Sequence, residues 1–409
     1  MRAPDWAAEG WSSTRGPSIR NVRVVILDHT AALGGAELAL LRLLDRVDRD
    51  EFEVHTILFS HGPLEGELTR AGHRVIVLPL DVEIATTGRH AAGGSVWSAA
   101  RNTARVLPFA IRLGRALRGL APDVVHTTSL KADLIGVPAA WMAGVPLVWH
   151  IHDRVSPDYL PALMVRLLRA LARWVPRHVI VNSAATASTL PGVRRVTIAY
   201  PGFSPDQAGP PPAGREAPAN RFVGILGRVS PTKGQLVFVR AAARVLSARP
   251  DVRFRIIGAP LFSEQDYAEE VRREVDALGI AGGLEFAGFV ADPTEALDAL
   301  TLCVHASPTP EPFGQVIVEA MVRGVPVVAT RGGGVTEIVA PDAEAEPLGW
   351  LVPPDDVIAL SDAILDALDH PETARRRADA AWASAQERFP IERTAATISE
   401  VWRSVARRG

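Results

Sequence analysis

The sequence has very little of several residue types, and each shortage excludes something. Its 409 residues include one cysteine, Cys303, so no disulfide bond forms within the chain. Because Cys303 lies in an apolar run, we expect it to pack as a small hydrophobic side chain in a reducing compartment. Basic and acidic residues number 44 and 46, so the chain has no net positive field that would attract nucleic acid. Only two of the basic residues are lysines, Lys131 and Lys233.

Long hydrophobic runs are missing too. The longest uncharged apolar stretch, residues 134–149, is only 16 residues long and contains Pro138, Gly144 and Pro146. A membrane-spanning helix needs roughly 20 residues. We therefore expect a buried helix, a turn and a strand in this stretch. Residues 1–20 have no apolar core of the kind found in signal peptides, and we interpret them as a flexible tail of a cytoplasmic protein.

Strand-like and helix-like runs alternate along the chain, which predicts parallel sheets covered by helices. Six predicted strands belong to an N-terminal domain, residues 21–203, and five to a C-terminal domain, residues 221–390. The predicted strands are 22–27, 52–59, 74–78, 124–127, 147–151 and 178–182, then 222–226, 252–257, 284–289, 302–306 and 325–329. The sequence thus predicts an α/β fold with two Rossmann-like, doubly wound domains.

The segment between these domains, residues 204–220, is rich in Pro, Gly and Ala and is typical of a linker. We expect residues 391–409 to form a helix that packs back on the N-terminal domain. Open α/β sheets bind ligands at the carboxyl ends of their strands. We therefore expect the two domains to face each other across a cleft, with the functional residues on strand-to-helix loops.

Two of these loops follow the first strand of a domain. Gly34 and Gly35 open a helix, where paired glycines let a phosphate approach backbone N–H groups and the positive end of the helix dipole. An ordinary tight turn is the alternative. In the second domain the loop GRVSPTKG carries Arg228 and Lys233, two cations that suit a diphosphate without a metal. Solvated surface cations are the alternative there.

The segment SPTPEPFGQVIVEA, which starts at Ser307, is the most informative one. Its alternating prolines hold the backbone extended, and Gly314 allows a sharp entry into a helix. Glu311 therefore lies before the helix and Glu319 on its second turn. One carboxylate suits the hydroxyls of a sugar and the other a ribose diol, while the helix N-terminus suits a phosphate between them.

A histidine pair ends the predicted strand 147–151, in the sequence WHIHDR. Strand alternation puts His150 and His152 on the same face, with His152 nearer the loop. A histidine in a strand is more often a core residue with its hydrogen bonds satisfied. We favour a functional role for His152 and a core role for His150.

Together these motifs resemble the retaining glycosyltransferases of family 4, which have the two-domain GT-B fold. The resemblance runs from about Val22 to Arg403, and its most specific parts are the Gly-Arg pair with the following Lys and the two glutamates separated by seven residues. It implies a set of contacts with a nucleotide-sugar donor. The implied contacts are pyrophosphate with Arg228 and Lys233, sugar with Glu311, ribose with Glu319, and sugar and phosphate with backbone groups of Phe313 and Gly314.

The resemblance also assigns residues of the N-terminal domain. It implies that His152 lies beside the donor sugar and is important for activity, and that Gly34 and Gly35 form a loop beside the reaction centre. The segment HTTSLKA resembles an HTHSSKA pattern of polysaccharide-building members, but Thr128 replaces the second histidine. Lys131, in this segment, and His150 are further candidates.

The implied activity is retaining transfer of a hexose-type sugar from a nucleoside diphosphate sugar to a lipid-linked, polysaccharide or glycoconjugate acceptor. It implies no metal and no cofactor besides the sugar nucleotide. The one Asp-x-Asp motif, Asp48 to Asp50, falls in a turn before a strand, and we interpret it as a surface turn. A GT-B-like sugar-nucleotide epimerase and a catalytically silent sugar-nucleotide-binding partner protein are the alternatives.

Two segments of the N-terminal domain, residues 101–120 and 161–178, are basic and apolar without an acidic residue. In the second, one set of apolar residues recurs at helical spacing and a set of arginines lies between them. These sets are Leu163, Leu167, Leu171 and Trp174, and Arg166, Arg169, Arg173 and Arg177. Either this helix docks on anionic lipid at the inner face of the plasma membrane, or its leucines pack in the core and its arginines face water.

Overall fold

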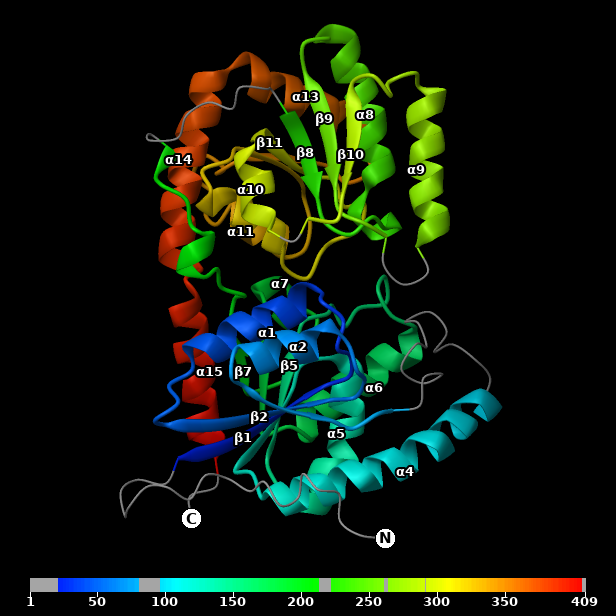
Figure 1. Cartoon of the computed structure of the whole chain (residues 1–409), viewed down its shortest axis with the longest axis vertical. Coiled ribbons are helices and arrows are strands. Elements are labelled where there is room, and N and C mark those ends of the chain that lie inside the picture. The colour runs from blue at the N-terminus through cyan, green and yellow to red at the C-terminus, as the bar shows by residue number, and fades with distance from the viewer. Residues whose placement is uncertain (1–20, 81–95, 213–221, 261–263, 291, 407–409) are drawn as a thin grey trace. The chain divides into compact units, whose positions relative to one another are not determined.

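A computed structural model of the chain describes residues 21–80, 96–212, 222–260, 264–290 and 292–406, and of residues 96–105 it describes the backbone alone. The predicted tail, residues 1–20, lies outside the described residues. The chain divides into two compact units, which Figure 1 shows. The first unit is Met1–Gly202 with Ile391–Gly409, and the second is Phe203–Pro390.

The first unit has a seven-stranded sheet in the order β3-β2-β1-β4-β5-β6-β7, in which neighbouring strands pair in parallel. Its strands are β1 (Val22–Asp28), β2 (Phe52–Leu58), β3 (Arg74–Val77), β4 (Val124–Thr127), β5 (Leu147–Ile151), β6 (His178–Val181) and β7 (Val196–Ile198). Its helices are α1 (Gly35–Arg46), α2 (Pro63–Arg70), α4 (Val96–Leu120), α5 (Leu130–Ala143), α6 (Ala162–Trp174), α7 (Ala184–Ser188) and α15 (Ile391–Val405).

The second unit has a six-stranded sheet in the order β10-β9-β8-β11-β12-β13, again with parallel pairing. Its strands are β8 (Phe222–Leu226), β9 (Arg253–Ile257), β10 (Leu284–Gly288), β11 (Leu300–His305), β12 (Val327–Thr330) and β13 (Trp350–Val352). Its helices are α8 (Gln235–Ala248), α9 (Gln265–Ala277), α10 (Pro293–Asp298), α11 (Gln315–Val322), α12 (Gly334–Val339), α13 (Val357–Asp369) and α14 (Pro371–Arg388), with short 3-10 turns η3 (Pro205–Gln207) and η5 (Pro231–Lys233).

The prediction of two doubly wound parallel sheets is confirmed, and the predicted strands are present with ends shifted by at most a few residues. The prediction of six and five strands was wrong by one in each sheet, because it missed β7 and β13. Each of these strands has three residues and lies at the edge of its sheet. A run this short gives no clear alternation of apolar and polar residues.

Strands in the middle of these sheets are buried on both faces, as parallel strands covered by helices usually are. In β1, Val25 and Leu27 belong to one hydrophobic cluster and Val24 and Ile26 to another. The buried Cys303 likewise fills space in β11 and forms no disulfide, and burial raises the pKa of its thiol to about 12. The prediction that Cys303 packs as a hydrophobic side chain is confirmed.

Helix α15 belongs to the core of the first unit although it follows the second unit in the chain. It packs against α1, β1 and β6 (Figure 1). Its side chains Ile398 and Trp402 are fully buried in the same cluster as Val24 and Leu40. The sheet of the first unit is therefore covered on one face partly by residues from the far end of the sequence.

The first part of the predicted linker is attached to the second unit. The N–H of Gly209 donates a hydrogen bond of 2.8 Å to the carbonyl of Val322, and the indole N–H of Trp382 donates one of 3.3 Å to the carbonyl of Gly209. Residues 213–220 of the predicted linker lie outside the described residues. Within the described part of the chain, no helix combines the length and the hydrophobicity needed to cross a bilayer.

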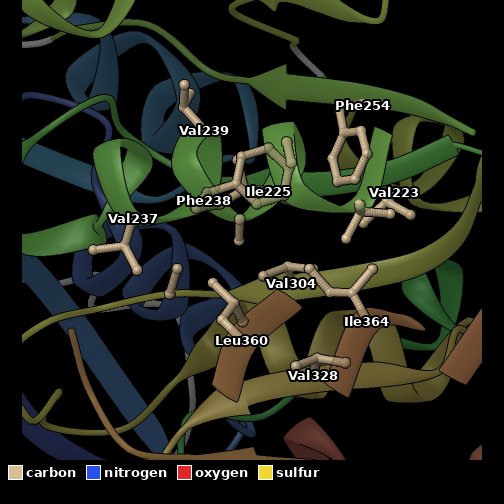
Figure 2. Close-up of a cluster of buried hydrophobic side chains, with 14 of the residues drawn as sticks. Val223, Ile225, Val237, Phe238, Val239, Phe254, Val304, Val328, Leu360 and Ile364 are labelled. Atoms are coloured by element: carbon tan, nitrogen blue, oxygen red, sulfur yellow. The ribbon is translucent and has the colours of Figure 1, made fainter. Parts of the chain in front are cut away.

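The core of the second unit lies between α8, α13 and the sheet (Figure 2). Phe238 on α8 is fully buried there, with its ring edge-on to that of Phe254 at a centroid distance of 5.6 Å. Aromatic pairs of this kind contribute both buried area and favourable ring geometry.

We predict that Phe238→Ala lowers the free energy of unfolding by about 3–5 kcal/mol, because it removes a fully buried ring and leaves a cavity. Urea denaturation followed by circular dichroism measures this. The control is Phe289→Ala, since Phe289 is 70% exposed and its loss should change the free energy by less than about 0.5 kcal/mol. Equal effects of the two substitutions would contradict the core assignment.

Candidate functional site

Both sheets reverse their strand order at one point, between β1 and β4 in the first unit and between β8 and β11 in the second. At such a point the loops leave the carboxyl ends of adjacent strands in opposite directions, and ligands of open α/β sheets bind there. Most of the predicted site residues follow these strands. They are divided between the two units.

In the second unit, glycine brings the loop after β8 against the end of β11. Gly234 ends the turn η5 and begins α8 with a φ of 78°, a left-handed conformation that favours glycine. A Cβ atom at this position would overlap the carbonyl oxygen of Ala306. The side chain of the neighbouring Lys233 is thereby held next to the segment that follows β11.

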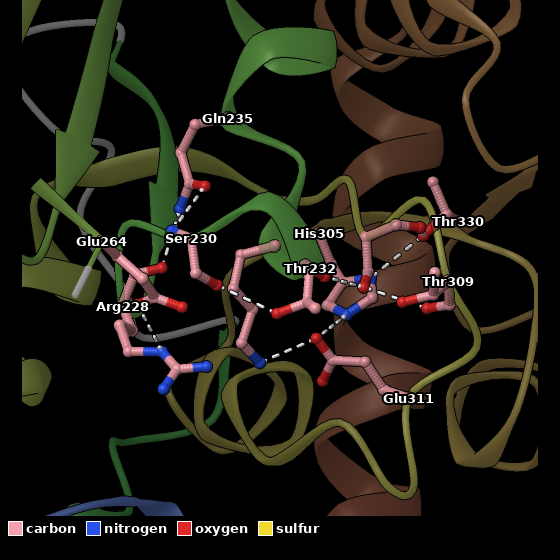
Figure 3. A network of polar contacts seen from close by, with 11 residues as sticks. Arg228, Ser230, Thr232, Gln235, Glu264, His305, Thr309, Glu311 and Thr330 are labelled. Atoms are coloured by element: carbon pink, nitrogen blue, oxygen red, sulfur yellow. Dashed lines mark hydrogen bonds and ion pairs between the residues drawn. The ribbon is translucent and has the colours of Figure 1, made fainter. Parts of the chain in front are cut away.

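The side chain of Lys233 forms an ion pair with Glu311, with 2.7 Å between Nζ and Oε1. The Nε2 atom of His305, the last residue of β11, lies 3.2 Å from the same oxygen (Figure 3). Burial by itself would raise the pKa of Glu311, but the nearby Lys233 and His305 outweigh it and hold the pKa well below its usual range. Glu311 is therefore an ionised carboxylate at neutral pH.

Arg228 forms a separate ion pair, with 3.2 Å between its Nε and Oε2 of Glu264 (Figure 3). Its backbone is fixed by the fully buried Gln235, whose amide N–H donates to the carbonyl of Arg228 over 2.9 Å. The amide oxygen of Gln235 accepts from the N–H of Ser230 over 3.3 Å. Each predicted phosphate-binding cation thus has its own acidic neighbour.

The entry into α11 has a backbone that few residues other than glycine adopt. Gly314, before the first residue of α11, has a φ of 124°. Phe313 is buried, with its ring edge-on to that of Phe389 at 5.6 Å. Gly333 packs on Glu311 so closely that a Cβ atom would overlap the Glu311 carbonyl oxygen.

Glu319 does not join the group around Glu311. It lies on the second turn of α11, half-buried, where its Oε1 accepts a hydrogen bond of 3.4 Å from the side chain of Gln315. The structure therefore brings Lys233 and Glu311 together and leaves Arg228 and Glu319 with other partners.

In the first unit, Gly34 and Gly35 lie where β1 leads into α1. Gly34 is extended and caps the helix, and Gly35 is its first residue. A Cβ atom at Gly34 would lie 2.5 Å from Oε2 of Glu37. Burial, together with the nearby negative charge of Asp28, raises the pKa of Glu37 to about 7. The first turn of α1 therefore carries a carboxyl group that titrates near neutral pH.

His152 follows the last residue of β5, and its backbone carbonyl accepts a hydrogen bond of 3.0 Å from the side chain of Asn182. Its ring and that of the buried His150 are 4.0 Å apart, as expected from strand alternation. Burial lowers the pKa of His152, although Asp153 and Asp28 act in the opposite direction. Lys131 lies in the first turn of α5, which follows the neighbouring strand β4.

The side chains that α6 buries are not those that one of the two interpretations of its sequence expected. The side chains that α6 buries are Val165, Leu168 and Ala172. Leu163, Leu167 and Trp174 are instead exposed to 79%, 45% and 80%. Leu171, the remaining member of the stripe, is partly buried and packs against the core. The interpretation that the stripe packs in the core was therefore wrong for Leu163, Leu167 and Trp174.

The four arginines of this region divide into two kinds. Arg169 is half-buried and donates hydrogen bonds of 2.9 and 3.0 Å to the carbonyls of Thr189 and Val155, so it has a structural role. Arg166, Arg173 and Arg177 are exposed, although Arg173 also donates a hydrogen bond of 3.1 Å to the carbonyl of Gly192. The exposed face of α6 thus combines large apolar side chains with arginines.

The Asp-x-Asp motif is a surface turn, as predicted. Asp48 and Asp50 are exposed in the turn before β2, where the N–H of Asp50 donates to the Asp48 carboxylate over 2.8 Å. Among the residues that the structure describes, no three His, Cys, Asp or Glu side chains form a group able to hold a metal ion.

Sequence reasoning missed four features of the site: Glu264, His305, Gln235 and the turn Gly332–Gly334. Three consecutive glycines, shortly after the predicted strand 325–329, were a usable signal for the turn. Glu264 gave no such signal, because its partner Arg228 lies in a distant loop. Gln235 and His305 have partners close in sequence, but no sequence pattern shows that these side chains meet.

The fold and these loops define a GT-B glycosyltransferase. Two family models match the chain, "Glycosyltransferase Family 4" over residues 33–207 and "Glycosyl transferases group 1" over residues 212–383. The chain belongs to glycosyltransferase family 4, and the prediction of the family is confirmed.

Similar proteins agree with this membership. The lipopolysaccharide core biosynthesis mannosyltransferase LpsB of Rhizobium meliloti is 32% identical over 64% of this chain and 80% of its own length. The D-inositol 3-phosphate glycosyltransferase of Streptomyces scabiei is 28% identical over 91% of this chain and 87% of its own. The crystal structure of HepE from Anabaena, in complex with UDP and glucose, has a TM-score of 0.79 and 29% identity and covers 94% of this chain and 100% of HepE.

We predict that the raised pKa of Glu37 makes stability depend on pH. Between about pH 4.5 and 7 the folded chain keeps a proton on Glu37 that the unfolded chain releases. The free energy of unfolding should therefore fall as pH rises through this range, by roughly 1–3 kcal/mol, and Glu37→Gln should remove that fall. Urea denaturation at pH 5 and pH 8 measures it.

The matched control is Glu295→Gln, which changes an exposed glutamate in the first turn of α10. It should leave the difference between pH 5 and pH 8 as in the wild type. If Glu37→Gln also leaves that difference unchanged, the assignment of a titrating Glu37 is wrong.

Proposed function

We propose that the chain is a retaining, metal-independent glycosyltransferase that moves a hexose-type sugar from a nucleoside diphosphate sugar to a lipid-linked, polysaccharide or glycoconjugate acceptor. The observation that carries the proposal is the contact between Lys233 and Glu311. It puts a cation suited to a departing diphosphate beside an ionised carboxylate suited to sugar hydroxyls. The side chains of Lys233 and Glu311 are only 30% and 13% exposed, which does not fit the alternative of solvated surface residues.

Three sources of positive charge support metal independence. Arg228 and Lys233 follow β8, and the N-terminus of α11 supplies the positive end of its helix dipole. Negative charge that develops on the diphosphate as the sugar leaves is stabilised by fixed positive groups of this kind. We propose that these groups take the part that a metal ion plays in other transferases.

Retention follows if the acceptor attacks on the face from which the diphosphate departs. The bond between the anomeric carbon and the diphosphate oxygen breaks, and a bond from the acceptor oxygen to the same carbon forms. The acceptor's proton passes to the departing diphosphate, so the step needs no side-chain base. We propose that His152 hydrogen-bonds the donor sugar during this step, which suits an imidazole that burial keeps neutral.

The remaining contacts are proposed from the resemblance to family 4. Glu319 binds the ribose diol, and backbone groups of Phe313 and Gly314 bind the sugar and the phosphate. Gly34 and Gly35 admit the diphosphate to the N-terminus of α1. Lys131 remains a candidate for the acceptor side.

One relative supports an acceptor from the cell envelope, because its name places it in the synthesis of a lipopolysaccharide core. We propose an acceptor of this kind for the chain.

We predict that the protein releases nucleoside diphosphate from one member of a panel of UDP, GDP, ADP and dTDP sugars, and that a crude membrane extract used as acceptor raises the rate. EDTA should leave the rate unchanged, because Arg228, Lys233 and α11 stabilise the diphosphate. Loss of activity in EDTA would contradict metal independence. Donor binding without release, or conversion of the donor to an isomer, would favour the silent-partner or epimerase alternative.

The same assay tests the site. Lys233→Ala and Glu311→Ala should each lower kcat by roughly 100-fold or more, the usual cost of losing a group that stabilises transition-state charge. The matched controls are Arg240→Ala and Glu274→Ala, which break an ion pair of the same length, 2.7 Å, between α8 and α9. Near-wild-type rates in both site variants would overturn the assignment.

We further propose that the exposed face of α6 contacts anionic membrane at the inner face of the plasma membrane, where lipid-linked acceptors are held. Exposed Leu163, Leu167 and Trp174 beside Arg166 and Arg173 support this. Apolar side chains that enter the lipid interface and arginines that meet anionic headgroups are the usual components of such a surface.

A hollow next to this face is also lined by apolar and basic side chains. Its volume is about 720 Å³, and its lining includes Trp141, Trp174, Arg177 and Arg195. Trp141 is 82% exposed. Tryptophans are favoured at membrane interfaces because their rings are apolar and their N–H groups are polar.

We predict that the double variant Arg166→Glu with Arg173→Glu lowers binding to vesicles containing anionic phospholipid by roughly 30-fold or more, at about 1 kcal/mol for each arginine lost. Vesicle sedimentation measures this. The control, Arg272→Glu with Arg273→Glu on α9, makes the same change of charge elsewhere and should have little effect. Unchanged sedimentation of the α6 variant would overturn the membrane proposal.

A further inference from the structure

Three buried nitrogen-bearing rings form a chain of hydrogen bonds in the first unit. The indole N–H of Trp402 on α15 lies 2.9 Å from Nδ1 of His126 on β4. The Nε2 atom of His126 lies 3.3 Å from Nδ1 of His150 on β5. Trp402 and His126 are fully buried and His150 is 6% exposed. The first contact joins residues 276 positions apart in the sequence.

The chemistry of these rings determines which ring donates and which accepts in each hydrogen bond. An indole N–H donates and never accepts, so Nδ1 of His126 must accept and carries no proton. A neutral His126 therefore has its proton on Nε2 and donates it to Nδ1 of His150. The proton of a neutral His150 is in turn on Nε2. One donor on α15 thus decides which nitrogen of His150 carries its proton.

Both histidines are held in the neutral form by their surroundings. Burial lowers the pKa of His126 to about 3 and that of His150 well below its ordinary value. Charged or titratable groups also act on this region from neighbouring elements. These are His152 and Asp153 after β5, and Asp28 at the end of β1, which accepts a hydrogen bond from Thr128.

Among the residues that the structure describes, the last nitrogen of this series of hydrogen bonds has no partner. Nε2 of His150 is buried, and in the described part of the protein it makes no hydrogen bond. Such orphaned donors are rare in folded proteins and call for a reason. The ring of His150 lies against that of His152, with centroids 4.0 Å apart and planes tilted by 37°. Trp402 therefore determines the protonated nitrogen of His150, the ring that packs on His152.

We propose that Trp402, His126 and His150 are positioning residues for His152, and that the N–H of Trp402 fixes the proton of His150 on Nε2 so that His152 packs on a neutral ring. The functional part of this inference rests on the proposed role of His152 in transfer. In wild-type protein Nε2 of His150 already carries a proton, and Nδ1 accepts from His126. No nitrogen of His150 is then free to take a second proton.

Loss of the Trp402 donor removes this restraint. His126 can then place its proton on Nδ1 and accept a hydrogen bond at Nε2 from Nδ1 of His150. The Nε2 atom of His150 becomes a free acceptor, and a proton can bind to the His150–His152 pair. Activity that needs neutral His152 should then be lost at a higher pH than in the wild type.

The test combines an NMR measurement with a pH profile. Trp402→Phe removes the N–H and keeps an aromatic ring edge-on to Phe52. In the wild type, ¹⁵N NMR should show His126 and His150 as single Nε2–H tautomers. In Trp402→Phe it should show mixed tautomers, and the acid limb of kcat/KM should move up by about one pH unit, with donor KM within twofold of the wild type.

Two variants of His126 keep the inference testable if Trp402→Phe fails to fold. A glutamine at 126 has an oxygen that accepts from Trp402 and an N–H that donates to His150, whereas leucine has neither. His126→Gln should keep the wild-type tautomer of His150 and the wild-type pH profile. His126→Leu should lose both.

The matched control is Trp382→Phe, which removes an indole N–H bonded to a carbonyl in the second unit. It should leave tautomers and pH profile unchanged. An unchanged His150 tautomer in both Trp402→Phe and His126→Leu would overturn the inference, as would equal damage from His126→Gln and His126→Leu. The NMR measurement does not require the protein to be active. Failure of the proposed function is therefore distinguishable from failure of this inference.

Discussion

A carboxylate that is mostly shielded from water needs an opposite charge beside it, and the carboxyl ends of strands β8 and β11 are arranged to supply one. Moving an ion out of water costs several kcal/mol unless an opposite charge and hydrogen bonds accompany it. Glu311 meets this need with Lys233, from the loop after β8, and His305, from the end of β11. Gly234 lets the two loops come close enough. The need to neutralise Glu311 therefore also constrains the distance between the two loops and the position of the glycine.

The sequence predicts well what is decided locally. Strand β8 lies where hydrophobic periodicity put it, and helix α11 begins after Gly314 as expected, because neighbouring residues suffice to define a strand between two loops or a helix after a glycine. The partner Glu264 was not predictable, because nothing near it in sequence shows that it meets Arg228 in a distant loop. His305 lies close to Glu311 in sequence, but no pattern shows that the two side chains meet. The same holds for Trp402, whose partner His126 lies in another part of the chain.

Helix α6 shows a further limit of sequence patterns. Periodicity correctly groups Leu163 with Leu167, and Val165 with Leu168, on two faces of one helix. It does not say which of two apolar faces is buried, since both sets are hydrophobic enough to join a core. Arg169 decides it, because its hydrogen bonds to the carbonyls of Thr189 and Val155 tie its side of the helix to the unit.

The position of α15 has a consequence for how the protein is made. The second unit is one continuous stretch, Phe203–Pro390, whereas the first needs Ile391–Val405 to complete one face of its core. During synthesis the ribosome therefore delivers everything the second unit requires before the first unit has its final helix. The first unit begins to emerge earlier but is completed later, and until then the buried His126 lacks the indole that orients it.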